Sequence, residues 1–377
     1  MSFYAIIDKG ISAMKIKRAL ATVLIVSTAL FCVSCRKGGN TGNDSSGLTP
    51  SVGQTKKIDV MKDWKDLNDP REKFPPAGTQ TGETSPRIVK TKYETKDIIV
   101  ADIVPTEMGY AVDSTGAADS TDGIQQALYD CYYDGGGTVF LPAGNYAITD
   151  TIVIPQGVTL RGDWQDPDVG KEYGTVFSVW MDSSEENTGG AFTLYDSSGV
   201  VGITVYYPFQ TLYEVLPYPF TFYVANTSQV ITIRDITVIN GYRGIGTSVE
   251  VPHEILIIDN FKGTFLKSGM ELNNQSDVGT VESVKISSKY WKEASAEYMN
   301  APVDNEIDSY VKKNAVGLII SDLEWTTFGD IAVDGYQIGI KIIPGYRINF
   351  AGSLIDVNIT NCEIGLLAQG IDEDWGM

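Results

Sequence analysis

The chain has 377 residues with 43% hydrophobic content, which is enough to bury the core of one large domain or of two ordinary ones. Its 29 basic and 48 acidic residues give a net charge of −19, which excludes the basic surface that nucleic-acid binding needs. The single histidine, His253, excludes zinc sites built from several histidines.

An export signal is predicted over residues 1–34. Lys15, Lys17 and Arg18 precede an apolar run over residues 19–33, shorter than the roughly 20 residues of a membrane-spanning helix. Residues 32–35, CVSC, resemble a bacterial lipoprotein cleavage site, which implies a lipid on Cys35 and anchoring at the bacterial cell surface or membrane. Ordinary signal cleavage and an uncleaved anchor are the alternatives, and translation starts at either Met1 or Met14.

A flexible tether is predicted over residues 35–95. This stretch is rich in Gly, Thr, Ser, Asp, Lys and Pro, and its apolar residues occur singly without a period. Such a segment would hold the folded part, predicted over residues 96–377, away from a membrane. Cys131 and Cys362 are the cysteines in that part, and we expect both thiols to be free.

One amphipathic helix is predicted near the start of the folded part. Residues 119–122 offer capping side chains, and Ile124, Ala127, Leu128 and Cys131 follow at helical spacing. The glycines of residues 135–137 end the helix because glycine accepts a left-handed turn.

Short strands follow, and one unit of them recurs. β-Branched tripeptides stand at residues 203–205, 236–238, 284–286, 331–333 and 357–359, with spacings of 33, 48, 47 and 26 residues. A solenoid repeats such a unit because each coil stacks on the previous one and buries the same inward positions. The long spacings predict loops inserted into coils.

Four segments carry a family resemblance: GAADSTD at 116–122, IQQA at 124–127, GGGTVFLPAGNY at 135–146 and IPQGVTLRG at 154–162. Together they resemble the cap and first coils of the pectate-lyase-like superfamily, which includes proteins related to glycoside hydrolase family 28. The resemblance implies an all-β fold, a right-handed parallel β-helix with an N-terminal capping helix. It also implies a polysaccharide partner and, through the lyases of the group, calcium as a cofactor.

The catalytic motifs of that superfamily are not matched. Its hydrolases use Asp-Asp and His-Gly signatures, whereas this sequence has no Asp-Asp dipeptide and His253 is followed by Glu254. No lyase calcium motif is recognisable either, so the metal site is left unassigned. Arg234, Arg243 and Lys285 are possible bases for a lyase, although Arg234 beside Asp235 also fits a surface ion pair.

Candidate catalytic carboxylates lie in the later coils. Asp322 and Glu324 alternate onto one face, and Asp330 and Asp334 are expected on one face by the two-residue period of a strand. Asp356 lies in the next coil and is expected beside them. A solvated outer face is the alternative interpretation of all five carboxylates.

Aromatic residues suggest sugar contacts, because sugar rings stack on flat aromatic faces. Residues 206–223 are crowded with Tyr and Phe, and packing against the solenoid is the alternative role. The candidates for substrate binding are Tyr206, Tyr207, Tyr213 and Trp325.

The end of the sequence shows no polar cap after the strand-like residues 365–368, so we expect an N-terminal fragment of a longer protein. The sequence therefore predicts an exported, lipid-anchored β-helix that cleaves an acidic or plant-type glycan by elimination or hydrolysis. A non-catalytic glycan-binding or adhesin module is the alternative, and a purely structural wall protein is a third. The sequence leaves the oligomeric state open.

Overall fold

The computed structural model describes residues 86–181, 186, 189–225, 229–295, 299–303 and 305–371. The predicted signal peptide, Cys35 and the tether up to residue 85 lie outside these residues. Within the described part of the chain, no helix is long and apolar enough to cross a membrane. The lipid anchor at Cys35 stays a prediction.

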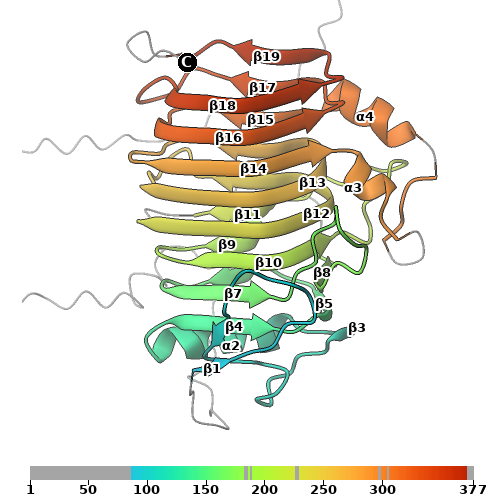
Figure 1. The fold of residues 1–377 in the computed structure, drawn as a ribbon, viewed down its shortest axis with the longest axis vertical. Coiled ribbons are helices and arrows are strands. Elements are labelled where there is room, and N and C mark those ends of the chain that lie inside the picture. Colours follow the sequence, from blue (N-terminus) through green and yellow to red (C-terminus); the bar gives the residue numbers. More distant parts are fainter. Residues whose placement is uncertain are drawn as a thin grey trace, which may run out of the picture. The chain divides into compact units, whose positions relative to one another are not determined.

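The described chain winds into stacked coils whose strands pair in parallel with strands of neighbouring coils (Figure 1). A separate short pair of strands, β1 (Arg87–Ile88) and β2 (Val100–Ala101), is antiparallel. The first sheet runs through β4 (Gly137–Leu141), β7 (Val158–Gly162), β10 (Gly199–Tyr206), β12 (Val230–Thr247), β13 (Ile255–Leu272), β14 (Gly279–Ser287), β16 (Glu324–Asp334) and β18 (Ala351–Thr360).

Two further sheets complete each coil. The second contains β3 (Thr115–Asp119), β5 (Gly144–Ile148) and β8 (Thr175–Val179), and continues in the later part of β10 and in the matching parts of β12, β13, β14, β16 and β18. The third contains β6 (Ile152–Ile154), β9 (Gly190–Leu194), β11 (Phe220–Val224), the ends of β12 and β13, β15 (Val316–Ile320), β17 (Ile338–Ile342) and β19 (Ile364–Ala368). This is the predicted right-handed parallel β-helix.

The tripeptides that predicted a solenoid do stack in register. Ile203 pairs with Ile236, and Val284 pairs with Ile331. The spacing of 48 residues hides a coil that the pattern missed, because β13 places Phe261, Lys262 and Gly263 between the two. The spacing of 47 residues is one coil whose insertion carries α3 (Lys289–Lys292) and α4 (Glu306–Asn314).

Inward side chains form one continuous core along the stack. The ring centroids of Phe177 and Phe192 lie 5.0 Å apart, and those of Phe192 and Phe222 lie 5.3 Å apart. All three rings are fully buried. Burial of each such side chain contributes about 1.5–3 kcal/mol, and only the neighbouring coils supply that burial.

Helix α2 (Thr121–Tyr133) covers one end of this core, as the helical spacing predicts. Its buried face includes Ile124 and Leu128, and it packs on β4, β6 and β7. Gln125 donates a hydrogen bond to the carbonyl of Val153 (3.0 Å) and accepts one from the amide of Val153 (2.8 Å). The side chain thus satisfies backbone groups of β6 that no further coil pairs.

A bend between the first and second sheets repeats from coil to coil. Gly202 has a φ of +73° there, and short polar side chains hold the equivalent position in later coils. Asn, Asp and Ser adopt this left-handed conformation more readily than larger residues because their side chains bond locally. The later bend residues are Asp235 (+55°), Asn260 (+55°), Ser283 (+54°), Asp330 (+50°) and Asp356 (+55°).

Candidate active-site groove

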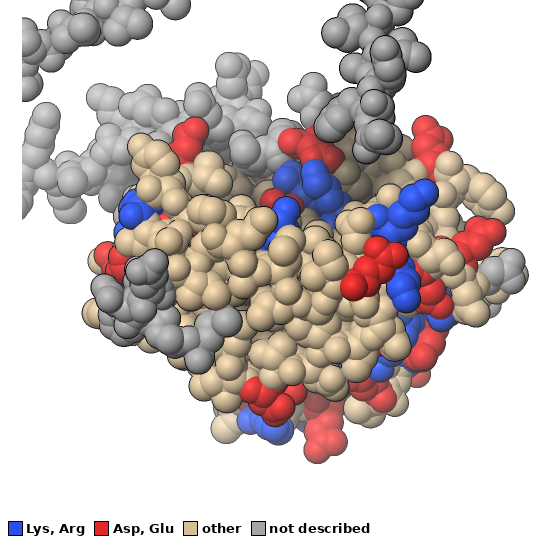
Figure 2. All heavy atoms as spheres, turned by 90° about the horizontal axis from the view of Figure 1, so that it is seen from above, with Lys and Arg blue, Asp and Glu red and all other residues tan. Residues whose placement is uncertain are grey.

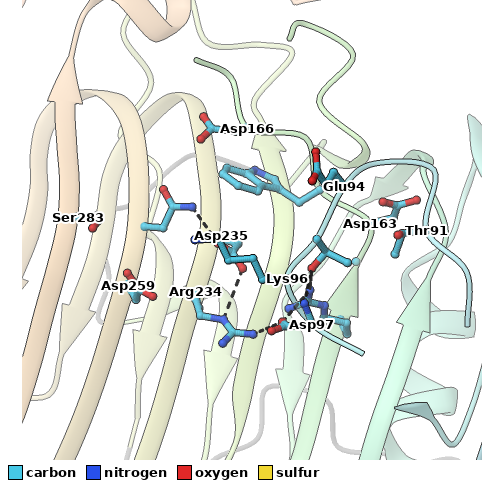
Figure 3. A pocket seen from close by; sticks show the side chains of 15 residues that line it. Thr91, Glu94, Lys96, Asp97, Asp163, Asp166, Arg234, Asp235, Asp259 and Ser283 are labelled. Atoms are coloured by element: carbon cyan, nitrogen blue, oxygen red, sulfur yellow. Dashed lines mark hydrogen bonds and ion pairs between the residues drawn. The ribbon is translucent and has the colours of Figure 1, made fainter. Parts of the chain in front are cut away.

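A cavity of about 410 Å³ lies along this bend (Figure 3). One wall is residues 89–99, which connect β1 (Arg87–Ile88) to the antiparallel β2 (Val100–Ala101) and are called the strap below. A second wall is the loop after β7, and the floor is the outer surface of β12, β13 and β14. Residues 86–95 were predicted as tether, but the structure places them against the β-helix.

The floor of the groove is a column of outward side chains set by strand register. Arg161 pairs with Val201, Val201 with Arg234, and Arg234 with Asp259. Asp259 in turn pairs with Glu282. Adjacent strands lie about 4.8 Å apart, so charged groups far apart in the sequence become neighbours.

Two arginines share one carboxylate in the groove. Asp97 of the strap lies 3.1 Å from Arg161 Nη2 and also forms an ion pair with Arg234, as Figure 3 shows. The Arg161 side chain is only 8% exposed. Burial lowers the pKa of Arg161, and the nearby charge of Asp97 opposes that shift. Arg234 Nε also lies 3.4 Å from Asp235.

Asp259 is the groove carboxylate best suited to carry a proton. Burial raises its pKa, and the charges of Asp235 and Glu282 add to the shift, against the opposing effect of Arg234. Its neighbour Asp235 accepts a hydrogen bond of 2.8 Å from the Asn260 amide. A carboxyl group with a raised pKa next to a carboxylate that accepts a hydrogen bond can divide the roles of acid and base.

Asp163 also has a raised pKa, because it is 3% exposed. Its carboxylate accepts hydrogen bonds from the backbone amides of Lys92 (2.5 Å) and Tyr93 (3.2 Å), which oppose the effect of burial. Asp163 therefore fastens the strap to the β-helix.

Trp164 supplies an aromatic side chain at the groove. Its Nε1 donates to Thr237 Oγ1 at 2.9 Å, which fixes the indole against the second sheet. Half-buried aromatic rings are typical surfaces for stacking a sugar. Trp164 was not among the predicted sugar-binding residues, although it lies two residues after the family-like segment that ends at Gly162.

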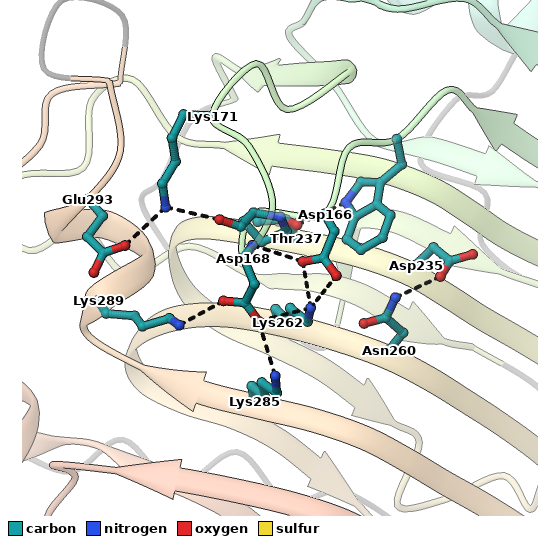
Figure 4. Close-up of polar contacts among 12 residues, drawn as sticks. Asp166, Asp168, Lys171, Asp235, Thr237, Asn260, Lys262, Lys285, Lys289 and Glu293 are labelled. Carbon is teal, nitrogen blue, oxygen red and sulfur yellow. Dashed lines mark hydrogen bonds and ion pairs between the residues drawn. The ribbon is translucent and has the colours of Figure 1, made fainter. Parts of the chain in front are cut away.

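Lysines anchor the loop that carries Trp164 (Figure 4). Lys262 is 5% exposed and lies 2.6 Å from Asp166 and 3.1 Å from Asp168. Lys285 and Lys289 lie 3.1 Å and 2.7 Å from Asp168. Burial raises the pKa of Asp168, but the three lysines outweigh this effect and hold that pKa well below its usual range. Lys285, considered as a base, is thus engaged in an ion pair.

Two predicted catalytic carboxylates lie together at a different corner of the coils. Arg347 Nη2 lies 3.0 Å from Asp322 Oδ1, and Arg347 Nη1 lies 3.3 Å from Glu324 Oε1. Asp322 is 3% exposed and also accepts a hydrogen bond of 2.9 Å from the Arg347 amide. This arrangement ties the segment around Arg347 to the coil, and neither carboxylate lines the groove.

Of the other three predicted carboxylates, Asp330 and Asp356 hold the same bend position in adjacent coils, as expected for Asp356, whereas Asp334 does not share a face with Asp330. Asp330 and Asp356 are bend residues with positive φ, which breaks the alternation that would have put Asp330 and Asp334 on one face. Asp334 instead accepts hydrogen bonds of 2.6 Å from Thr360 and from Asn361. None of the three lines the groove.

The predicted aromatic platform is divided. Tyr206 and Tyr207 are 3% and 1% exposed, so they are core residues and present no face to a sugar, which corrects the prediction for both. Tyr213 and Trp325 are exposed (97% and 52%). Tyr213 borders a second cavity of about 440 Å³ that Trp291 also lines.

Among the described residues, no three His, Cys, Asp or Glu side chains are grouped closely enough to hold a metal ion. In the groove, Asp97 is instead paired with Arg161 and Arg234, and Lys96 adds a further positive charge to the lining. Calcium stays a prediction for this chain.

Solved structures with similar folds come from several sources. ORF18 of Geobacillus virus E2 is 13% identical with a TM-score of 0.36, and the match covers 69% of this chain and 58% of that one. The A-module of the mannuronan C-5 epimerase AlgE6 of Azotobacter vinelandii is 12% identical (TM-score 0.35; 69% and 77% covered). An exopolygalacturonase of Thermotoga maritima is 11% identical (TM-score 0.19; 73% and 94% covered).

These values are too low to transfer a function to this chain, which spans little more than half of the viral protein. No curated protein matches the sequence significantly. The family model for rhamnogalacturonase A/epimerase, pectate lyase-like proteins matches residues 107–376, which include nearly all of the coils. The chain therefore belongs to the rhamnogalacturonase A/epimerase, pectate lyase-like family.

Proposed function

We propose that the groove binds a polysaccharide and cleaves it by hydrolysis, with Asp259 as the general acid. The observation that carries this proposal is the placement of two carboxylates, Asp235 and Asp259, in one cavity, where burial raises the pKa of Asp259. Glycoside hydrolysis needs one carboxyl group that keeps its proton and one that is ionised.

In the proposed reaction, Asp259 gives its proton to the glycosidic oxygen, and the bond between that oxygen and the anomeric carbon breaks. Asp235 then either activates a water molecule or attacks the anomeric carbon, according to the separation of the two carboxyl groups around the sugar. When Asp235 acts as the base, it takes a proton from the attacking water, and proton exchange with solvent restores both carboxyl groups. When Asp235 attacks, water then breaks the ester bond between Asp235 and the sugar and gives its proton to Asp259.

The family membership supports a glycan as the substrate, and Trp164 offers a ring on which one sugar could stack. We expect the substrate to be an acidic or plant-type glycan. We also expect the protein to be exported and anchored through a lipid on Cys35. Calcium is tested by repeating each assay with a chelator, because calcium could bridge the acidic protein to an acidic polymer.

The test compares the full chain with its Asp259→Asn variant on acidic and neutral plant polysaccharides. Loss of the proton donor should lower the cleavage rate by about 10²–10⁴-fold. Asp330→Asn is the matched control: the same change at an exposed carboxylate outside the groove should leave the rate unchanged. Asn also fits the positive φ at that position.

The product distinguishes the chemistry. Hydrolysis yields new reducing ends without unsaturation, whereas elimination yields a carbon–carbon double bond with ultraviolet absorbance. Unsaturated products, or full activity of Asp259→Asn, would refute the proposed hydrolysis.

A second function, glycan binding without cleavage, is favoured by the half-buried ring of Trp164 at the groove and by the exposed ring of Tyr213 at the second cavity. It predicts no product from any glycan and weaker binding in Trp164→Ala. Asp259→Asn should then bind as tightly as the natural chain.

A further inference from the structure

The strap is held over the groove by polar contacts. Two amides of the strap bind the buried Asp163, and on the surface Lys92 Nζ and Tyr93 Oη contact Glu172 at 2.6 Å and 2.7 Å. No side chain from residue 91 to residue 98 is buried, and Ile98 is 80% exposed. Exposed polar contacts of this kind contribute little stability and are weakened by salt.

The two ends of the strap are held differently. Ile99 and Phe140 are buried in a small apolar cluster, and Val89 packs against it. Val89 also donates a backbone hydrogen bond of 3.0 Å to Ile99. The strap is therefore a hairpin loop with an apolar base, and its middle is held by polar contacts to Asp163, Glu172, Arg161 and Arg234.

Asp97 lies where two arginines of the groove, Arg161 and Arg234, meet. Arg161 is almost fully buried, and a buried guanidinium needs an anion because its charge has lost most of its water. Asp97 supplies that anion to Arg161 and to Arg234 together. The carboxylate of another molecule can make the same contacts, because the donors of a guanidinium group match the geometry of any carboxylate.

We propose that the strap is a displaceable cover, and that Asp97 occupies the site where the carboxylate of an acidic sugar binds between Arg161 and Arg234. This inference rests on the proposed function in that it takes the groove to be the glycan site. The carboxylate of a uronate replaces Asp97 at Arg161 and Arg234. The middle of the strap then moves away from the groove, while its apolar base stays in place. A neutral sugar cannot replace Asp97, so the strap makes the groove selective for acidic sugars.

Binding is measured by calorimetry on the full chain, with trigalacturonate and its fully methyl-esterified form as probes. The two differ in the charged carboxylates and share the sugar skeleton. If the open state is populated at about 10%, Asp97→Asn should bind trigalacturonate about tenfold more tightly. The methyl ester should bind both proteins more weakly than trigalacturonate, because it offers no carboxylate to Arg161 and Arg234.

Asp330→Asn is the matched control, because it removes the same charge by the same substitution at an exposed residue outside the groove. It should leave the affinity for trigalacturonate nearly unchanged. Arg234→Gln should abolish the preference for the acidic probe over the ester.

A second readout covers the case in which Asp97→Asn does not fold. In the natural chain, trigalacturonate should speed hydrogen exchange at the amides of Lys92 and Tyr93, because an open strap no longer donates them to Asp163. The methyl ester should not. Unchanged or slower exchange with bound trigalacturonate would overturn the proposal.

The outcomes separate this proposal from the proposed function. Tighter binding by Asp97→Asn without any cleavage would support the strap and refute hydrolysis. Cleavage that depends on Asp259, with equal affinity of Asp97→Asn and the natural chain for trigalacturonate, would support hydrolysis and refute the strap.

Discussion

His253, the one histidine of the chain, is a core residue. It is 1% exposed, and neither ring nitrogen has a hydrogen-bond partner among the described residues. Burial, with a smaller effect of Arg347, lowers its pKa to about 4. The folded protein therefore excludes a proton that the unfolded chain accepts near pH 6.5.

This difference makes stability depend on pH. Above pH 6.5 the ring is neutral in both states, and burying it costs no free energy of deprotonation. As the pH falls from 6.5 towards 4, stability is lost because the unfolded state binds a proton that the folded state excludes. The free energy of unfolding should fall by about 2 kcal/mol between pH 7 and pH 5 from His253 alone. Urea unfolding at both pH values measures it.

The His253→Leu variant is the comparison, since leucine cannot take up a proton. Its unfolding free energy should change about 2 kcal/mol less than that of the natural chain over the same interval. An equal loss in both proteins would show that another group causes the pH dependence.

Among the structural elements, the bend between the first and second sheets has the clearest consequence for the groove. It turns each long strand at one residue with positive φ, and it sets Asp235 beside Asn260. The same bend explains why alternation along a strand failed to predict the positions of Asp330 and Asp334. A left-handed residue shifts every later side chain relative to the earlier ones.

Asn260→Ala should therefore destabilise the fold. Alanine at a φ of +55° costs about 1–2 kcal/mol, and loss of the hydrogen bond to Asp235 adds about 0.5–1.5 kcal/mol. Asn260→Gly separates the two effects, because glycine accepts this φ freely and loses only the hydrogen bond. Equal unfolding free energies for the two variants would contradict a strained bend.

The elements at the start of the fold were predictable, whereas the groove was not. Helix α2 and the first strands follow from helical spacing, glycines and β-branched residues that are close in sequence. The groove joins Asp97, Arg161 and Asp259, which only strand register and the strap bring together. The β-branched pattern did not predict one coil, because Phe261 and Gly263 stand there in place of β-branched residues.

On the scale of the whole β-helix, each coil obtains its burial from the coils on either side. Side chains of the central strands β12 and β13 at inward positions are almost completely buried, while Ile364 and Leu366 of β19 are each 42% exposed. Figure 2 shows the described end surface as largely uncharged, with charged side chains mainly at its edge. A stack of this kind opens locally, with a stability that varies along its axis.

Hydrogen exchange should therefore be slowest at the amides of β13 and β14 and faster at those of β18 and β19. Ile258→Ala in the core of β13 should cost about 2–5 kcal/mol and speed exchange in β12, β13 and β14. Amides of β4 and β5, several coils away, serve as the internal control and should change less. Equal acceleration in every strand would mean that the β-helix opens only as one cooperative unit, contrary to the nearest-neighbour picture.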